Sequence, residues 1–378
     1  MLGKAPGAVP CAHCATALAR ADCPVCRRAV CDRCAHDWAT CSLPHGVELR
    51  LGLGRRLRAI DASGTFGVVT RWTRTYAWLD LRAARWLRGA TGVQRPFAPV
   101  GACYPALLSD GRIVYPSFIA YGDSYRYDGL RVSALAGGPP QPLPSHAPPR
   151  WLEIDWTERF VWGPCEDETI DLVDLERGDG WTLRPVDRTV VQAAAVDGVR
   201  RVLATGVYGA VHLHRLGSDG DLERIDRLAL PDSDVAWLGL SPRRLAVVAI
   251  RGSRSRLVVH ALGDEGIRGP VYEDPPARRP GTSPIVRAYG GRQSIVAAMD
   301  PTGRFVAVVD RKRRDVHVHG VDTGTVQRLG EHTDRIHFVR FAAGGRQLVS
   351  ADTDNRVLIR PLAGDAFVDA TRRLPIAD

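Results

Sequence analysis

The sequence predicts an all-β fold preceded by a small cysteine-rich module. Seven of the nine cysteines lie within the first 41 residues, and short β-type runs separated by Gly, Pro, Asp and Ser fill the chain from about Val47. A pattern of strands and tight turns also recurs near the C-terminus, and a repeat of about 20 to 50 residues is typical of propellers and solenoids. We therefore expect two units, residues 1–46 and 47–378.

The composition is that of an ordinary globular protein. The 378 residues are 45% hydrophobic and 25% charged, and no run approaches the ~18 apolar residues that cross a bilayer. The first ten residues lack the apolar segment of a secretory signal. We expect a cytoplasmic protein that has no membrane partner.

The net charge of +9 has two explanations. Lys4 and Lys312 are the only lysines and Asn355 is the only asparagine, so nearly all the positive charge is arginine. This bias is typical of a GC-rich, bacterial genome, in which codon use scatters arginines along the chain. Arginines selected for phosphate binding are clustered instead. Nucleic acid therefore stays an alternative partner, behind protein.

Eight soft metal ligands lie near the N-terminus. Each C-x-x-C step turns two thiolates toward one ion, and Zn²⁺ takes four such ligands in a tetrahedron. Eight ligands predict two closed, structural zinc sites per chain, and a module this small needs the metal for its folding energy. Disulfides and free thiols are the alternatives, but paired C-x-x-C steps in an intracellular chain favour metal. The ligands are Cys11, Cys14, Cys23, Cys26, Cys31, Cys34, Cys41 and His45.

This pattern resembles the B-box zinc finger, a relative of RING domains, over Cys11 to His45. The resemblance implies a cross-brace, in which Cys41 stands where the family often has His, and His13 and His36 lie near enough to compete at the second site. B-box modules mediate interactions, so it also implies protein binding or self-association. A RING-like recruiter in a ligase-type assembly is the alternative. The implied ligand sets are Cys11, Cys14, Cys31 and Cys34 for one zinc, and Cys23, Cys26, Cys41 and His45 for the other.

The second unit is organised in repeats. Two consecutive stretches near the C-terminus, 294–324 and 330–362, follow each other at the interval of about 40 residues that one propeller blade occupies. Residues 47–53 are expected to form the outer strand of the last blade and to close the ring, which removes exposed sheet edges. Six or eight blades, or a pair of β-sandwiches, are the alternatives to seven. The expected first strands lie near Leu57, Cys103, Trp151, Val190, Val235, Ser294 and Arg335.

The repeats resemble WD repeats. The resemblance implies a seven-bladed WD-repeat-like β-propeller to about residue 370, with residues 370–378 as a surface tail. Arg360 and His319 stand where the family has a third-strand Trp. The matching positions are Asp300 to Gly303 in the first turn of a blade, Asp322 to Gly324 in the third, and His332, Ser350 and Asp354 in a structural hydrogen-bond network.

Charge is expected to divide between the two faces of the ring. Turns between second and third strands, and links between blades, emerge on one face, here called the link face, and the remaining turns emerge on the opposite face. Arginines gather in the link-face segments, and an acidic protein surface is the partner that this charge fits. Charged turns that only keep loops solvated are the alternative. The candidate partner-binding residues are Arg251, Arg254, Arg256, Arg311, Arg313 and Arg314.

No pattern in the chain predicts catalysis. His332, Ser350 and Asp354 can be read as a triad, but no Gly-x-Ser-x-Gly elbow accompanies them. The pairs His212/His214 and His317/His319 share strand faces and are expected at third-strand core positions instead of at a metal. The sequence therefore predicts a non-enzymatic scaffold or adaptor, with two structural Zn²⁺ ions as its cofactors.

Overall fold

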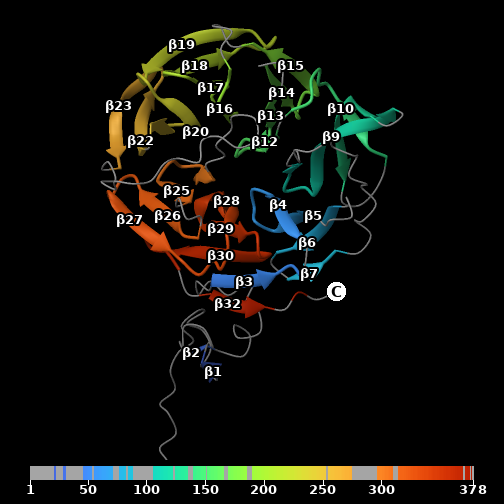
Figure 1. Ribbon diagram of the computed structural model, residues 1–378, viewed down its shortest axis with the longest axis vertical. Coiled ribbons are helices and arrows are strands. Elements are labelled where there is room, and N and C mark those ends of the chain that lie inside the picture. The colour runs from blue at the N-terminus through green and yellow to red at the C-terminus, as the bar shows by residue number, and fades with distance from the viewer. Residues whose placement is uncertain are drawn as a thin grey trace, which may run out of the picture.

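The computed structural model describes most of the chain. The described residues are 21–22, 29–30, 46–52, 55–70, 76–81, 84–87, 105–121, 124–134, 139–149, 151–165, 169–184, 190–252, 254–274, 296–309, 314–368, 371–374 and 376. From residue 46 onward their strands form a ring of antiparallel sheets, each sheet one blade (Figure 1).

The first three blades contain four strands each, in chain order from the axis outward. Blade 1 contains β4 (Arg56–Ile60), β5 (Phe66–Thr70), β6 (Tyr76–Asp80) and β7 (Arg85–Trp86). Blade 2 contains β8 (Ala106–Leu107), β9 (Arg112–Tyr121), β10 (Ser124–Ala134) and β11 (Gln141–Leu143). Blade 3 contains β12 (Glu153–Ile154), β13 (Phe160–Pro164), β14 (Ile170–Asp174) and β15 (Asp179–Leu183).

Blades 4 to 6 repeat this arrangement. Blade 4 contains β16 (Ala193–Asp197), β17 (Val202–Val207), β18 (Ala210–Leu216) and β19 (Leu222–Ala229). Blade 5 contains β20 (Asp234–Ser241), β21 (Arg244–Arg251), β22 (Arg254–Gly263) and β23 (Gly266–Glu273). Blade 6 contains β24 (Ala297–Met299), β25 (Phe305–Val309), β26 (Val316–Gly320) and β27 (Thr325–Leu329). All seven blades begin within a few residues of the expected first strands.

Blade 7 is built from both ends of the described ring. It contains β28 (Ile336–Ala342), the short 3-10 helix η2 (Ala343–Gly345), β29 (Gln347–Asp352), β30 (Arg356–Ala363) and β31 (Ala366–Phe367). The strand β3 (Gly46–Arg50) pairs antiparallel with β30, with Val47 opposite Ile359, as expected for a closing strand. The segment expected as a surface tail contains a further strand, β32 (Thr371–Leu374), which pairs in parallel with β3 at the outer end of the sheet.

Hydrophobic packing joins the blades. The buried apolar side chains form seven clusters, one at each junction between neighbouring blades, so the core is a ring of interfaces. The closing strand contributes Val47, Leu49 and Leu51 to the cluster between blades 7 and 1. Alternate residues of a strand face opposite sides of the sheet, so Glu48 lies on the other side, where it meets Arg356 at 2.6 Å.

A recurring aspartate shapes the turn between first and second strands. Asp61, Asp155 and Asp300 are buried, and each carboxylate accepts a hydrogen bond from the hydroxyl of a Ser or Thr two residues later. Each carboxylate further accepts the backbone N–H of a phenylalanine five residues on, at 2.6, 2.7 and 2.6 Å respectively. The pattern Asp-x-Ser/Thr-x-x-Phe therefore starts the second strand of blades 1, 3 and 6.

The predicted zinc ligands lie outside the described residues. In that part of the chain the structure describes one antiparallel pair, β1 (Ala21–Asp22) with β2 (Ala29–Val30). The zinc module therefore stays a prediction. Among the residues that are described, no helix has both the length and the apolar character to cross a membrane.

Candidate functional site

Two of the three residues that suggested a catalytic triad, His332 and Ser350, lie together in blade 7. His332 Nε2 is 2.8 Å from the Ser350 hydroxyl, and His332 Nδ1 is 3.1 Å from a carboxylate oxygen. That carboxylate belongs to Asp352, not to Asp354 as expected. Asp354 instead accepts a hydrogen bond from Thr333 at 3.1 Å.

Burial decides the role of this network. Ser350 and Asp352 are 0% exposed and His332 is 7% exposed, so a substrate has no path to the hydroxyl. Arg360, also 0% exposed, donates to the Ser350 hydroxyl at 3.3 Å and to the Gly330 carbonyl at 2.6 Å. With the proton of His332 on Nδ1, this nitrogen donates to Asp352 and Nε2 accepts the Ser350 hydroxyl proton. The network is structural, as the resemblance implied.

Burial also sets the protonation of the network. Desolvation lowers the pKa of His332, although the hydrogen bond to Asp352 raises it, so the ring is neutral. Burial raises the pKa of Asp352, but hydrogen bonds from His332 and from backbone N–H groups outweigh this and hold the pKa below its ordinary value. A neutral histidine beside an ionised carboxylate is the state that this arrangement stabilises.

The family Trp position is occupied by basic side chains in four successive blades. In each of these blades the basic residue of the third strand lies opposite an apolar residue of the second strand. The four basic residues therefore occupy equivalent positions in their blades. Desolvation lowers the pKa of His260, and it lowers the pKa of His319 to about 4. The pairs are His214 with Leu203, His260 with Leu245, His319 with Val306, and Arg360 with Leu348.

His212, His214 and His319 occupy buried third-strand positions, as expected, whereas His317 is only half-buried. His214 Nε2 lies 3.3 Å from the Thr205 hydroxyl, and His319 Nδ1 lies 2.8 Å from the Tyr272 hydroxyl of blade 5. The described residues contain no group of three or more His, Cys, Asp or Glu placed to hold a metal ion. The contacts of His214 and His319 therefore join strands and blades.

Charged side chains of the inner strands and their turns interact with groups of other blades. Arg340 of blade 7 donates to the Ile154 carbonyl of blade 3 at 3.5 Å. Burial raises the pKa of Glu153 to about 7, and the positive charge of Arg340 opposes this rise. In the turn after β12, Glu158 accepts the backbone N–H of Ser109 in blade 2 at 2.7 Å. These side chains tie blades across the ring.

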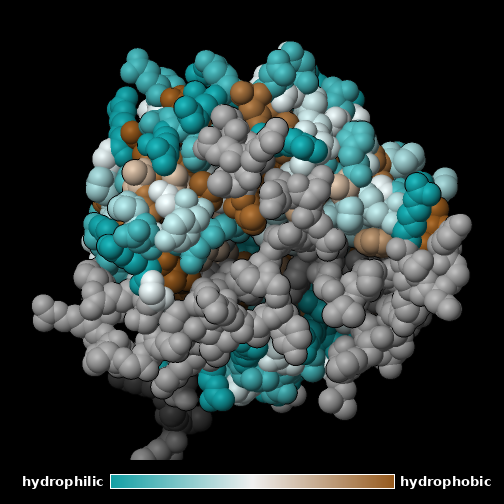
Figure 2. All heavy atoms as spheres, turned by 45° about the horizontal axis from the view of Figure 1, so that its top comes forward, coloured by the Kyte–Doolittle hydropathy of each residue, from teal (hydrophilic) through white to brown (hydrophobic). Residues whose placement is uncertain are grey.

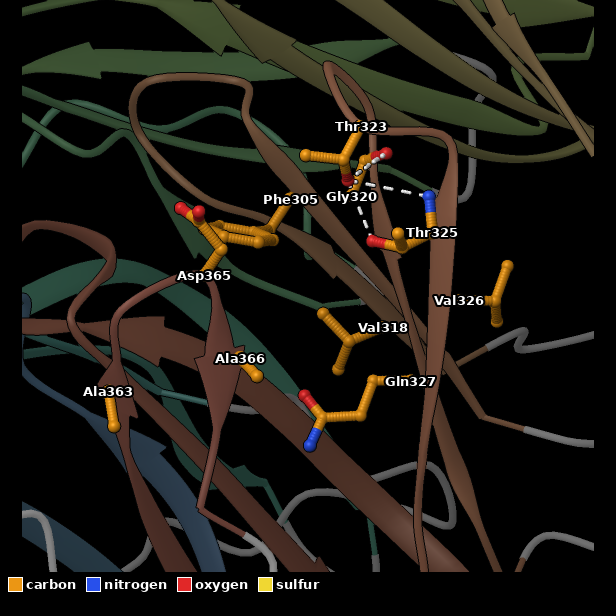
Figure 3. Close-up of a pocket in the computed structure, with 10 residues that line it drawn as sticks. All are labelled: Phe305, Val318, Gly320, Thr323, Thr325, Val326, Gln327, Ala363, Asp365 and Ala366. Atoms are coloured by element: carbon orange, nitrogen blue, oxygen red, sulfur yellow. Dashed lines mark hydrogen bonds between the residues drawn. The ribbon is translucent and has the colours of Figure 1, made fainter.

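A wedge-shaped pocket opens between blades 6 and 7, with a volume of about 430 Å³ (Figure 3). Thr323 and Thr325 line one side, and Asp365 on the β30–β31 hairpin lines the other. Asp365 pairs with Arg304 at 3.0 Å and is the one titratable side chain among the described lining residues. Acid–base catalysis needs a positioned donor or acceptor of suitable pKa beside the reacting group, and this pocket offers one exposed, paired carboxylate.

The predicted basic surface is partly neutralised. Arg251 pairs with Asp232 of the link before blade 5 at 3.0 Å, and Arg256 pairs with Glu273 of β23. Arg314 is exposed, and its positive charge helps to lower the pKa of Asp334 in the link before blade 7. The side chain of Arg254, and the whole of Arg311 and Arg313, lie outside the described residues. The prediction from turn positions did not include the acids that pair with Arg251 and Arg256.

Sequence reasoning missed an exposed aromatic residue on the link face. Tyr208 is 62% exposed in the turn between β17 and β18. The next residue, Gly209, has a φ of 78°, which favours glycine. Its N–H donates to the Ser233 carbonyl at 2.9 Å, and its carbonyl accepts from Leu230 N–H at 2.8 Å. The sequence feature that could have predicted this exposed tyrosine is the two-residue Tyr-Gly turn between two apolar strands.

Other apolar side chains lie at the same end of blade 4. Val190, just before β16, is 49% exposed, and Pro231 is exposed in the link that pins the turn. The Arg251–Asp232 ion pair lies next to Pro231. Tyr208, Val190 and Pro231 are called the blade-4 patch below. On the face that Figure 2 presents, the described hydrophobic residues lie in small groups among hydrophilic ones.

Comparison with known proteins bears on the fold. No protein-family model matches the chain, and no curated protein matches it. Among solved structures, the β-propeller domain of Cps50 (Swd1) from Myceliophteria thermophila matches 84% of this chain and 100% of that chain, with a TM-score of 0.59. The chain has a WD40-type β-propeller fold. The sequence identity is 13%, so the likeness concerns the fold alone.

Proposed function

We propose that this protein is a non-enzymatic scaffold that binds a partner protein through the link face of its propeller. The observation that carries this proposal is Tyr208, which is 62% exposed on a turn held by two backbone hydrogen bonds. Exposed, rigid aromatic residues dominate protein–protein binding energy because they bury a large area at small entropy cost. An apolar centre beside the Arg251–Asp232 pair matches the core and rim of an interface.

The chemistry elsewhere in the ring supports binding over catalysis. The Ser350 hydroxyl has the partners of a catalytic serine but is fully buried and also bonded by Arg360. The pocket between blades 6 and 7 brings one carboxylate, Asp365, that is already paired. A WD40-type propeller commonly acts as a rigid interaction platform.

The proposed partner presents an acidic surface. The chain carries a net charge of +9, and Arg126 and Arg314 are exposed at the link face. Complementary charge speeds encounter more than it strengthens the complex. Because Arg251 already pairs with Asp232, affinity at the blade-4 patch depends mainly on apolar contact. The predicted two-zinc module adds a second contact or a point of self-association, which would raise avidity.

Affinity capture from the native host tests this proposal. The full-length protein is compared with Tyr208→Asp and with Val199→Asp as the matched control. Val199 is 61% exposed in the turn at the other end of β17, on the opposite face. We expect a discrete partner set that is lost with Tyr208→Asp, at least about tenfold in recovery, and kept with Val199→Asp.

Two further arms separate the alternatives. Zinc is measured on the intact protein and on a Cys11→Ser, Cys14→Ser variant, and we expect two ions per intact chain with loss of metal and of part of the partner set in the variant. Binding of nucleic acid alone, with affinity that falls steeply with salt, would contradict the scaffold proposal. So would equal capture by both the Tyr208 and the Val199 variants.

A further inference from the structure

A two-stranded ribbon extends beyond the rest of blade 2. The inner parts of β9 and β10 are flanked by neighbours, since β8 pairs with β9 at Ile113 and Val114, and β11 pairs with β10 from Leu130 onward. The outer parts, residues 118–121 and 124–127, pair only with each other among the described strands. They are called the blade-2 ribbon below, and Figure 1 shows these two strands reaching past their shorter neighbours.

One face of the blade-2 ribbon is fixed to the propeller. Phe118 and Tyr127 are cross-strand partners, and their rings meet edge to face with centroids 5.6 Å apart. The Tyr127 hydroxyl also hydrogen-bonds the Ser145 hydroxyl, in the link between blades 2 and 3. An isolated hairpin is only marginally stable in water, so these contacts hold the ribbon in one conformation.

The other face is open. Ile119 and Arg126 are the next cross-strand pair, so their side chains lie together on the side away from Phe118 and Tyr127. Ile119 is 55% exposed, and Arg126 is exposed and forms no ion pair with any other described residue. An apolar side chain and a guanidinium therefore stand next to each other on a rigid, projecting support.

We propose that the blade-2 ribbon binds an extended peptide segment that carries an apolar residue beside a carboxylate. The apolar residue packs on Ile119, and the carboxylate takes the bidentate pair that a guanidinium favours. The extended backbone suits a β-ribbon, whose peptide groups accept an added strand. This deepens the scaffold function proposed above, because it names the chemistry of a second contact on the same face.

Other occupants fit this face less well. Two copies of the chain related by a two-fold axis would bring Arg126 of each copy to the same small contact, because a two-fold interface pairs the same surface with itself. Nucleic acid would pair with Arg126 but would leave Ile119 exposed or packed against phosphate.

A displayed library of short random peptides tests the inference. Full-length protein is the bait, and enriched peptides are synthesised and titrated against purified variants of equal thermal stability. We expect enrichment of sequences with an aliphatic or aromatic residue next to Asp or Glu. Ile119→Asp and Arg126→Glu should each weaken these peptides at least about tenfold, and Arg126→Glu should shift the selection toward Lys and Arg. The control Val271→Asp, at a 46% exposed position of blade 5, should leave binding within about twofold.

Each outcome is decisive. Peptides that depend on both Ile119 and Arg126 support the inference. No enrichment, or peptides that bind both variants as tightly as the original protein, would overturn it. Peptides that are lost with Tyr208→Asp but kept with Ile119→Asp would overturn it too, while leaving the scaffold proposal standing.

Discussion

Blades 7 and 4 place a basic side chain at the same point of the third strand and hold it differently. Arg360 in blade 7 donates to Ser350 and to the Gly330 carbonyl, and Ser350 continues through His332 to Asp352. In blade 4, His214 Nε2 lies 3.3 Å from the Thr205 hydroxyl. The same register position therefore belongs to a four-residue polar network in blade 7 and contacts a threonine hydroxyl in blade 4.

The difference follows from how the blades are closed. The strands of blade 4 follow one another along the chain, so short turns hold them together. Blade 7 takes β3 from the other end of the ring, and its closure costs the entropy of joining distant chain ends. No short turn links β3 to its neighbour β30. The buried network of blade 7, together with the hydrogen bonds of Glu48 to Arg356 and Arg50, supplies directional interactions in this blade. We infer that polar interactions stabilise the closing blade more than they stabilise blade 4.

The largest expected effect is in the blade-7 network. Asp352→Ala removes the acceptor for His332 Nδ1 and for the N–H groups of Asp354 and Arg356. Breaking a buried charged network in this way should cost about 3 to 5 kcal/mol in the free energy of unfolding. The matched change in blade 4, Thr205→Val, should cost about 1 kcal/mol or less. Equal losses in urea denaturation would show that the two blades are held alike.

A smaller effect is expected at the closing strand. Glu48 is 6% exposed and bonds Arg356 at 2.6 Å and Arg50 at 2.9 Å. Glu48→Gln should lower the free energy of unfolding by about 1 to 3 kcal/mol, because the largely buried Arg356 guanidinium loses its counter-charge. The control Glu223→Gln breaks the exposed Arg215–Glu223 pair and should cost less than about 0.5 kcal/mol. A control loss as large as that of Glu48→Gln would refute the role of the closing pair.

The smallest expected effect is on the pH dependence of stability. Burial lowers the pKa of His319 to about 4, from an ordinary 6.5. Between these two pH values the unfolded chain binds more protons than the folded one. The contribution of His319 to the free energy of unfolding is therefore complete above pH 6.5 and declines as the pH falls toward 4. From pH 7 to 5 the loss should be about 2 kcal/mol, which His319→Gln should remove from the profile. Identical profiles for the two proteins would rule this out.

Repeated local patterns allowed much of the fold to be predicted. The starts of all seven blades, the closing role of residues 47–53 and the third-strand places of His214 and His319 follow from strand and turn spacing. Asp354 was expected where the structure has Asp352, because two aspartates lie within three residues at the end of β29 and only the fold decides which of them meets His332. The pairing of β32 with β3 joins the two ends of the ring, which no local pattern reveals.

Surface features were harder to predict, for a physical reason. Turn positions predicted Arg251 and Arg256 as surface cations, but their partial neutralisation depends on Asp232 and Glu273, which come from other segments. Tyr208 is a turn residue whose importance depends on its exposure and on the link that pins it. Exposure and contacts between distant segments are properties of the assembled ring.

The central claim is that the link face binds a partner protein, and capture by paired variants tests it most directly. Tyr208→Asp and Val199→Asp alter side chains of equal exposure, 62% and 61%, at opposite ends of one strand. The account predicts that the partner set is lost with the first change and kept with the second. A partner set that survives Tyr208→Asp unchanged would contradict the claim.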